Sequence, residues 1–111
     1  MDGDEVPSGG DAWFSVRCVF RDEGIGAYEE RITLWRAKDA AEAIRLAEAE
    51  AVEYAGMLDE FSYAGLAQSY ELADPVGHGA EVFSLFRESD LEPEAYLDTF
   101  FDTGSECQGE L

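Results

Sequence analysis

The side chains best suited to chemistry are few in this sequence, and their spacing does not bring them together. His78 is the only histidine, and it lies between two glycines in a stretch that predicts a surface turn. Cys18 shares its alternating face with apolar residues, which predicts a buried thiol rather than an accessible nucleophile. Cys107 forms no CxxC pair with it. We therefore expect no cofactor, no metal site and no catalytic residue that can be named.

The carboxylates do not form a catalytic or metal-binding pattern either. Glu29 and Glu30 are adjacent in a predicted strand, so their side chains point to opposite faces, and an ion pair with Arg17 or Arg31 is the expected use of one of them. The predicted helix carries further glutamates, which we interpret as a solvated face. No EF-hand, P-loop, GxGxxG, GxSxG or HExxH spacing is present. Whether the chain is an enzyme stays undecided, with the weight against it.

Period-two and helical patterns divide the chain into six predicted elements. Alternation and β-branched or aromatic content predict strands, and a run of helix formers with apolar residues at three- and four-residue steps predicts the long helix. The apolar stripe of this helix is predicted to contain Ala40, Ile44, Ala47, Ala51, Tyr54, Ala55 and Leu58. The predicted elements are strands at 12–20, 28–37, 61–74 and 81–88, a helix at 38–58 and a short helix at 92–101.

This order predicts an α+β fold. A ββαββ arrangement followed by a short C-terminal helix forms one antiparallel sheet of about four strands, with the long alanine-rich helix packed on one face. We expect a single domain at 12–102 and flexible acidic tails at 1–11 and 103–111.

The net charge of −19 limits the classes of partner. Nucleic-acid binding depends on Lys and Arg contacts to phosphate, and anionic membranes attract the same residues, so we expect neither partner. The sequence shows no basic-then-apolar leader and no apolar run long enough to span a bilayer, so we expect a cytoplasmic protein. The acidity itself has two interpretations, which are general solubility and recognition of a basic protein.

The sheet face away from the helix is the most informative surface. If the apolar residues of the first strand face the helix, and Ile32 and Leu34 of the second do the same, the opposite face has two tryptophans and two arginines. Tryptophan and arginine are enriched at interface hot spots. The tails, the C-terminal helix or a loop could cover this surface, a second copy could bury it, or it could bind a ligand. The candidate interface consists of Trp13, Ser15, Arg17, Arg31, Thr33 and Trp35.

Three stretches of the sequence are distinctive: the aromatic-rich strand from Trp13, the Tyr28-Glu29-Glu30-Arg31 run and the alanine-rich helix that ends near Tyr54. Together they resemble a bacterial domain-of-unknown-function family, family 4288. The resemblance extends more weakly through Phe86. It implies a small bacterial α+β domain, and it supplies no activity and no site residues.

Three hypotheses on function follow, in order of preference. The first is a non-enzymatic protein-interaction module that forms a homodimer through the candidate interface. The second is an acidic inhibitor or immunity-like protein that binds a basic partner. The third is a small-molecule-binding domain or an enzyme with a site near Tyr63, Tyr70 and His78.

Overall fold

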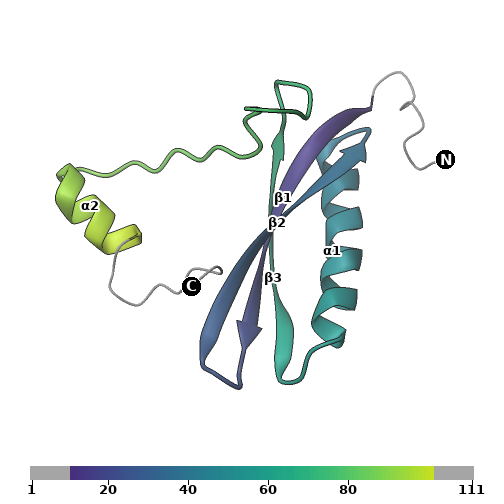
Figure 1. Ribbon diagram of the computed structural model, residues 1–111, viewed down its shortest axis with the longest axis horizontal. Coiled ribbons are helices and arrows are strands. Elements are labelled where there is room, and N and C mark those ends of the chain that lie inside the picture. The colour runs from purple at the N-terminus through teal and green to yellow at the C-terminus, as the bar shows by residue number, and fades with distance from the viewer. Residues whose placement is uncertain (1–10, 102–111) are drawn as a thin grey trace.

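The computed structural model describes residues 11–101. It is an α+β structure in which three antiparallel strands form one sheet and a long helix lies along one side of it (Figure 1). The strands and helices, in chain order, are β1 (Ala12–Asp22), β2 (Ala27–Ala37), α1 (Ala40–Gly56), β3 (Phe61–Glu71) and α2 (Pro93–Phe100).

The strand β1 is the centre of the sheet, and the strand order is β2-β1-β3. Its register with β2 is continuous from Ala12 opposite Ala37 to Asp22 opposite Ala27. The pairing with β3 shifts its register between Cys18 and Phe20. In β3, Gly65 has a φ of 89°, a left-handed backbone conformation that glycine adopts without strain.

The helix α1 begins at a side-chain cap. Asp39 is the N-cap, and its Oδ1 accepts a hydrogen bond of 2.8 Å from the Glu42 backbone N–H. A carboxylate oxygen of Glu42 in turn accepts from the Lys38 backbone N–H at 2.8 Å. These bonds satisfy amide groups that have no partner inside the helix.

The core lies between α1 and one face of the sheet. The helix places four alanines against this face, and β1 contributes every second residue to it. Because alanine has no side chain beyond Cβ, the helix axis can approach the sheet closely. Phe20 is fully buried and contacts the rings of Tyr54, Phe61 and Tyr63, which close one end of the core. The buried apolar residues of the two elements are Phe14, Val16, Cys18, Phe20, Ala43, Ala47, Ala51 and Ala55.

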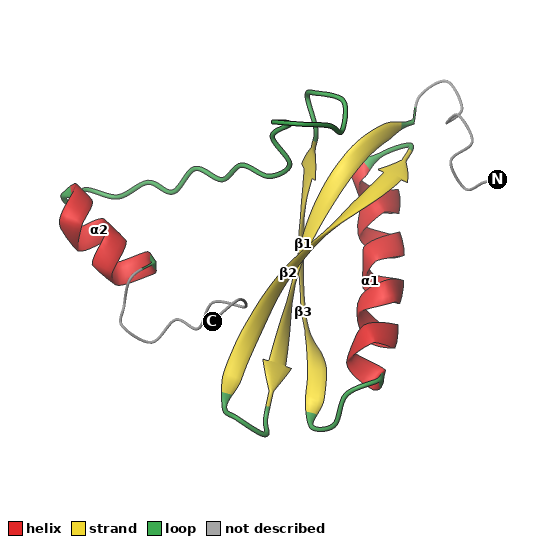
Figure 2. Ribbon diagram, viewed as in Figure 1, coloured by secondary structure: helices red, strands yellow, loops and turns green. Residues whose placement is uncertain are grey.

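The prediction of four strands is wrong, because the described chain has three. Residues 81–88 form no strand, although their alternation is typical of one. Alternation reports only that a segment suits a half-buried pleated surface, whereas a strand also needs a hydrogen-bonded neighbour. Instead the segment belongs to an irregular stretch that leads to α2, on the side of the sheet opposite α1 (Figure 2).

Two predictions about the helix need correction in detail. It covers Ala40–Gly56, inside the predicted 38–58, and three of its four buried residues, Ala47, Ala51 and Ala55, belong to the predicted stripe. Ala43 is buried, whereas Ala40 and Leu58 are exposed. The predicted tails at 1–11 and 103–111 lie outside the described residues, except for Asp11.

The alanine contact gives a stability prediction. We expect Ala47→Leu to lower the free energy of unfolding by about 1–3 kcal/mol, because the larger side chain forces α1 away from β1. Ala49→Leu is the matched control, since Ala49 is exposed on the same helix. We expect its effect to stay within about 0.5 kcal/mol. Urea denaturation of both variants measures the difference, and equal midpoints would contradict the close-packing argument.

Candidate functional site

The face of the sheet opposite α1, here called the outer face, is the candidate site. Its exposed apolar residues include Ile32 (46% exposed) and Leu34 (38% exposed), both on the edge strand β2. In the paired register, the outer face consists of Trp13, Ser15, Arg17, Val19 and Arg21 on β1, Tyr28, Glu30, Ile32, Leu34 and Arg36 on β2, and Ser62, Gln68 and Tyr70 on β3.

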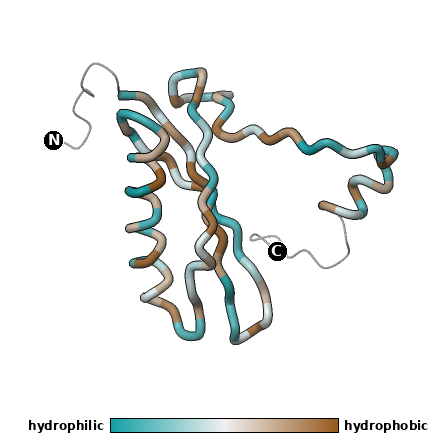
Figure 3. The backbone as a smooth tube through the Cα atoms, turned by 180° about the vertical axis from the view of Figure 1, so that it is seen from behind, coloured by the Kyte–Doolittle hydropathy of each residue, from teal (hydrophilic) through white to brown (hydrophobic). Residues whose placement is uncertain are grey.

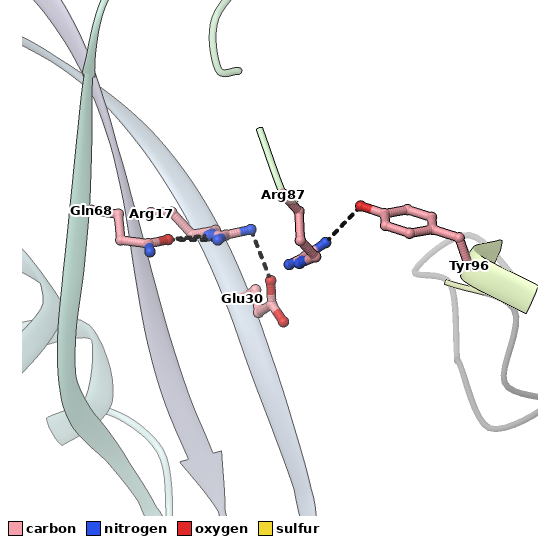
Figure 4. A network of polar contacts seen from close by, with 5 residues as sticks. All are labelled: Arg17, Glu30, Gln68, Arg87 and Tyr96. Carbon is pink, nitrogen blue, oxygen red and sulfur yellow. Dashed lines mark hydrogen bonds and ion pairs between the residues drawn. The ribbon is translucent and has the colours of Figure 1, made fainter. Parts of the chain in front are cut away.

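Arg17 is held at the middle of the outer face by both neighbouring strands. Its Nε and Nη2 donate to Gln68 Oε1 at 3.0 and 2.5 Å, and its Nη1 lies 3.4 Å from Glu30 Oε1 (Figure 4). The guanidinium also lies 5.0 Å from the centre of the Phe83 ring, a cation–π contact. The predicted ion pair between the hairpin strands is therefore present. The guanidinium is oriented by protein contacts rather than by water alone.

The other two predicted outer-face residues, Trp13 and Ser15, lie on the same strand and the same face as Arg17. Trp13 is half-buried, and the Arg36 guanidinium lies 5.0 Å from its ring centre. Ser15 is completely buried, and its Oγ is a buried atom with no hydrogen-bond partner within residues 11–101. Ser15 is thus a small residue covered by larger neighbours, and only Trp13 and Arg17 of the three are accessible.

The second half of the predicted interface lies on the wrong face. Because Phe14 pairs with Trp35 and Cys18 pairs with Arg31, the residues Arg31, Thr33 and Trp35 face α1. The predicted cluster is therefore split across the two sides of the sheet. A one-residue error in register moves every side chain of a strand to the opposite face. Ile32, Leu34 and Arg36 take the outer positions instead.

Arg31 is used for the contact between sheet and helix. Its two terminal nitrogens donate to the two carboxylate oxygens of Glu50 at 2.8 and 3.0 Å, a bidentate pair. The guanidinium stacks 3.8 Å from the Tyr54 ring centre. The hydrogen bond to Glu50 raises the pKa of Arg31, and the bond that Tyr54 donates to Glu29 raises the pKa of Tyr54. Trp35 donates from Nε1 to Thr33 Oγ1 at 2.6 Å.

A second polar group is built into the core beside Cys18. The Tyr63 hydroxyl donates to Glu48 of α1 at 2.5 Å. Burial and this bond raise the pKa of Tyr63 well above its usual range, and burial raises the pKa of the Cys18 thiol. A thiol with a raised pKa is a poor nucleophile at neutral pH, as predicted for a buried cysteine.

The residues of the third hypothesis do not meet. Tyr63 faces the helix, Tyr70 lies on the outer face, and His78 is exposed in the segment after β3. In the described part of the chain, no group of three His, Cys, Asp or Glu side chains is arranged to hold a metal ion. No helix within these residues is long and apolar enough to cross a membrane.

A cavity of about 510 Å³ lies at the turn end of the β1–β2 hairpin. Sequence reasoning missed this site, because its members come from β1, β2, α1 and β3 and only folding brings them together. Its lining combines carboxylates with aromatic rings, and it consists of Asp22, Ile25, Ala27, Tyr28, Glu29, Glu30, Tyr54 and Phe61.

No protein-family model matches the chain, and comparisons with curated proteins and with solved structures give no match either. The resemblance to family 4288 therefore stays a prediction.

The polar group in the core predicts a pH dependence. Because Tyr63 binds its proton more tightly in the folded state, its contribution to stability is complete below pH 10.0, the ordinary tyrosine pKa, and declines as the pH rises above it. We expect the stability advantage of the wild type over Tyr63→Phe to shrink above that pH. Urea titrations across the alkaline range measure it, with Tyr28→Phe on the exposed face as the control. A constant difference between wild type and Tyr63→Phe would contradict this account.

Proposed function

We propose that this protein is a non-enzymatic protein-interaction module that self-associates through the outer face of its sheet. The observation that carries the proposal is that α1 covers one side of a three-stranded sheet, while the described strands keep Ile32 and Leu34 exposed on the other side. The free energy of the system falls when a partner removes such exposed apolar side chains from water.

The polar residues of the outer face support an interface as well. Trp13 and Arg17 are residue types enriched at hot spots, and Gln68 and Glu30 hold Arg17 in place before any partner arrives. A side chain that is already oriented loses less conformational entropy on binding than a mobile one. The proposal includes a cytoplasmic location, and the resemblance to family 4288 is compatible with it without adding an activity.

The proposal predicts a dimer that an outer-face charge disrupts. We expect a wild-type dimer at micromolar concentration and a Leu34→Asp monomer, since the introduced carboxylate would be buried in the interface. Val52→Asp is the matched control, because Val52 is 63% exposed on α1 and lies away from the outer face. Size-exclusion chromatography with light scattering measures the mass, and circular dichroism checks the fold.

A monomeric wild type would refute self-association. Equal masses for folded Leu34→Asp and wild type would place the interface elsewhere. Trp35 is unsuitable for this test, since it packs against the core and a charge there would destabilise the fold.

A second candidate function is binding of a basic protein at the hairpin cavity. The specific observation is that Asp22, Glu29 and Glu30 line this cavity together with Tyr28 and Tyr54. Aromatic faces and carboxylates together suit a lysine or arginine side chain, through cation–π contact and ion pairing. The chain-wide charge of −19 would accelerate the encounter with such a partner.

This candidate predicts a local rather than a general charge effect. We expect Glu29→Gln/Glu30→Gln to weaken binding of an arginine-rich peptide by about tenfold, equivalent to about 1.4 kcal/mol. Glu53→Gln/Glu88→Gln makes the same change in net charge away from the cavity, and we expect a smaller effect. Fluorescence anisotropy at physiological salt measures both. Equal losses in the two variants would show that only the total charge matters.

A further inference from the structure

The segment that follows the sheet, here called the arm, consists of residues 73–101 and ends in α2. Within the described chain, α2 has no packing contact with any strand or with α1. The arm nevertheless exposes large apolar side chains, of which Phe86 is 97% exposed. Figure 3 shows hydrophobic residues along the segment that leads to α2. The exposed apolar residues of the arm are Val76, Val82, Leu85, Phe86, Leu91, Leu97, Phe100 and Phe101.

The helix α2 has one apolar side and one acidic side. Tyr96, Leu97 and Phe100 are one to four residues apart and share one side of the helix. Glu94 and Asp98 are four residues apart and lie on a different side. A helix of 8 residues gains little stability from its own hydrogen bonds, so it needs a surface against which to pack. Arg87, outside the helix, donates to the Tyr96 hydroxyl at 3.1 Å and stacks on Phe100.

One residue of the arm, Phe83, already contacts the outer face. The Phe83 ring lies 6.0 Å from the ring of Tyr70 and under the Arg17 guanidinium. The chain that follows β3 leaves the sheet and carries α2 away from it (Figure 1). The radius of gyration is 16.4 Å. A compact domain of 100 residues has about 13 Å, so the arm extends the molecule.

We propose that the arm of one copy docks on the outer face of a second copy, and that the exchange is reciprocal. The inference rests on the proposed self-association and names the segment that completes it. In a two-fold dimer each contact occurs twice, and exchange of an identical element requires no new surface. The apolar side of α2 covers Ile32 and Leu34 of the partner copy.

The charges of the two surfaces are complementary. In the paired register the outer face has three arginines, Arg17, Arg21 and Arg36, and one acidic residue, Glu30. The chain has only seven Lys and Arg residues in all, so nearly half lie on this face. Arg87 is the arm's single Lys or Arg, whereas its acidic residues are Asp74, Glu81, Glu88, Asp90, Glu92, Glu94 and Asp98. An acidic arm that approaches this face of another copy is attracted to it.

The proposed role of the arm can be tested separately from the role of the outer face. We expect Leu97→Asp/Phe101→Asp in the full chain to convert the dimer to a monomer, because Leu97 lies on the apolar side of α2 and Phe101, the residue that follows the helix, is also exposed. Thr99→Asp is the control on the same helix, and we expect it to stay dimeric. Light scattering measures both masses. A dimer that persists in the folded double variant would overturn the role of the arm and leave the proposed self-association intact.

Cross-linking identifies which copy provides the arm. Two full-length variants with different tags, Leu34→Cys and Leu97→Cys, are made in a Cys107→Ser background, equilibrated together and treated with a short bis-maleimide. We expect a covalent product that contains both tags. The double variant Leu34→Cys/Leu97→Cys reports the alternative in which an arm folds back on its own sheet.

Each outcome decides between the two proposals. A mixed-tag product supports arm exchange. A product within one chain only, from a monomer, overturns both arm exchange and self-association. A dimer that cross-links Leu34→Cys to Leu34→Cys, and not to Leu97→Cys, overturns arm exchange while the outer face remains the interface.

Discussion

The structure depends on the close contact between the alanines of α1 and the inward side of β1. Ala43, Ala47 and Ala51 leave no side-chain layer between the helix backbone and the strand, so the phenylalanines and valine of β1 fill the whole space. One helix of this kind covers one side of three strands. The uncovered outer face follows from that geometry, because the described residues provide only the arm to cover the other side, and α2 does not pack there.

The hairpin turn decides which residues belong to each face. Asp22 accepts hydrogen bonds from the Gly24 and Ile25 amides at 2.9 and 3.3 Å, which makes Asp22 the last residue before the turn. Pairing of Asp22 with Ala27 then places even-numbered residues of β1 opposite odd-numbered residues of β2. Hydropathy alone favoured Ile32 and Leu34 as inward residues. The turn sequence contains the information needed to predict the register, since an aspartate that caps a glycine-containing turn specifies where the pairing begins.

Predictability from sequence differed from element to element for physical reasons. The alternation in β1 and the helix formers of α1 are local patterns with strong periods, so the bounds of both elements were predicted within a few residues. The same alternation correctly predicted that Cys18 is buried. The strand predicted at 81–88 failed because its pairing partner is a non-local property. The split of the candidate interface has the same origin. The residue types of Arg31 and Trp35 are compatible with either face of the sheet, so they do not show which face each side chain occupies. Glu50 and Tyr54 compensate the charge of Arg31 on the inward side. Both belong to α1, so no local pattern in β2 predicts these contacts.

The net charge opposes self-association, whereas the distribution of charge favours it. Two copies with a net charge of −19 each repel one another as they approach. At physiological ionic strength the screening length is about 8 Å, so this repulsion is confined to the last stage of the encounter. At that distance the distribution of charge matters more than its sum, and the outer face is the cationic part of an otherwise acidic molecule. The same distribution explains why one chain supports two candidate surfaces. The acidic hairpin cavity suits a basic partner, whereas the arginine-bearing outer face suits an acidic segment, and the arm is such a segment within the chain itself.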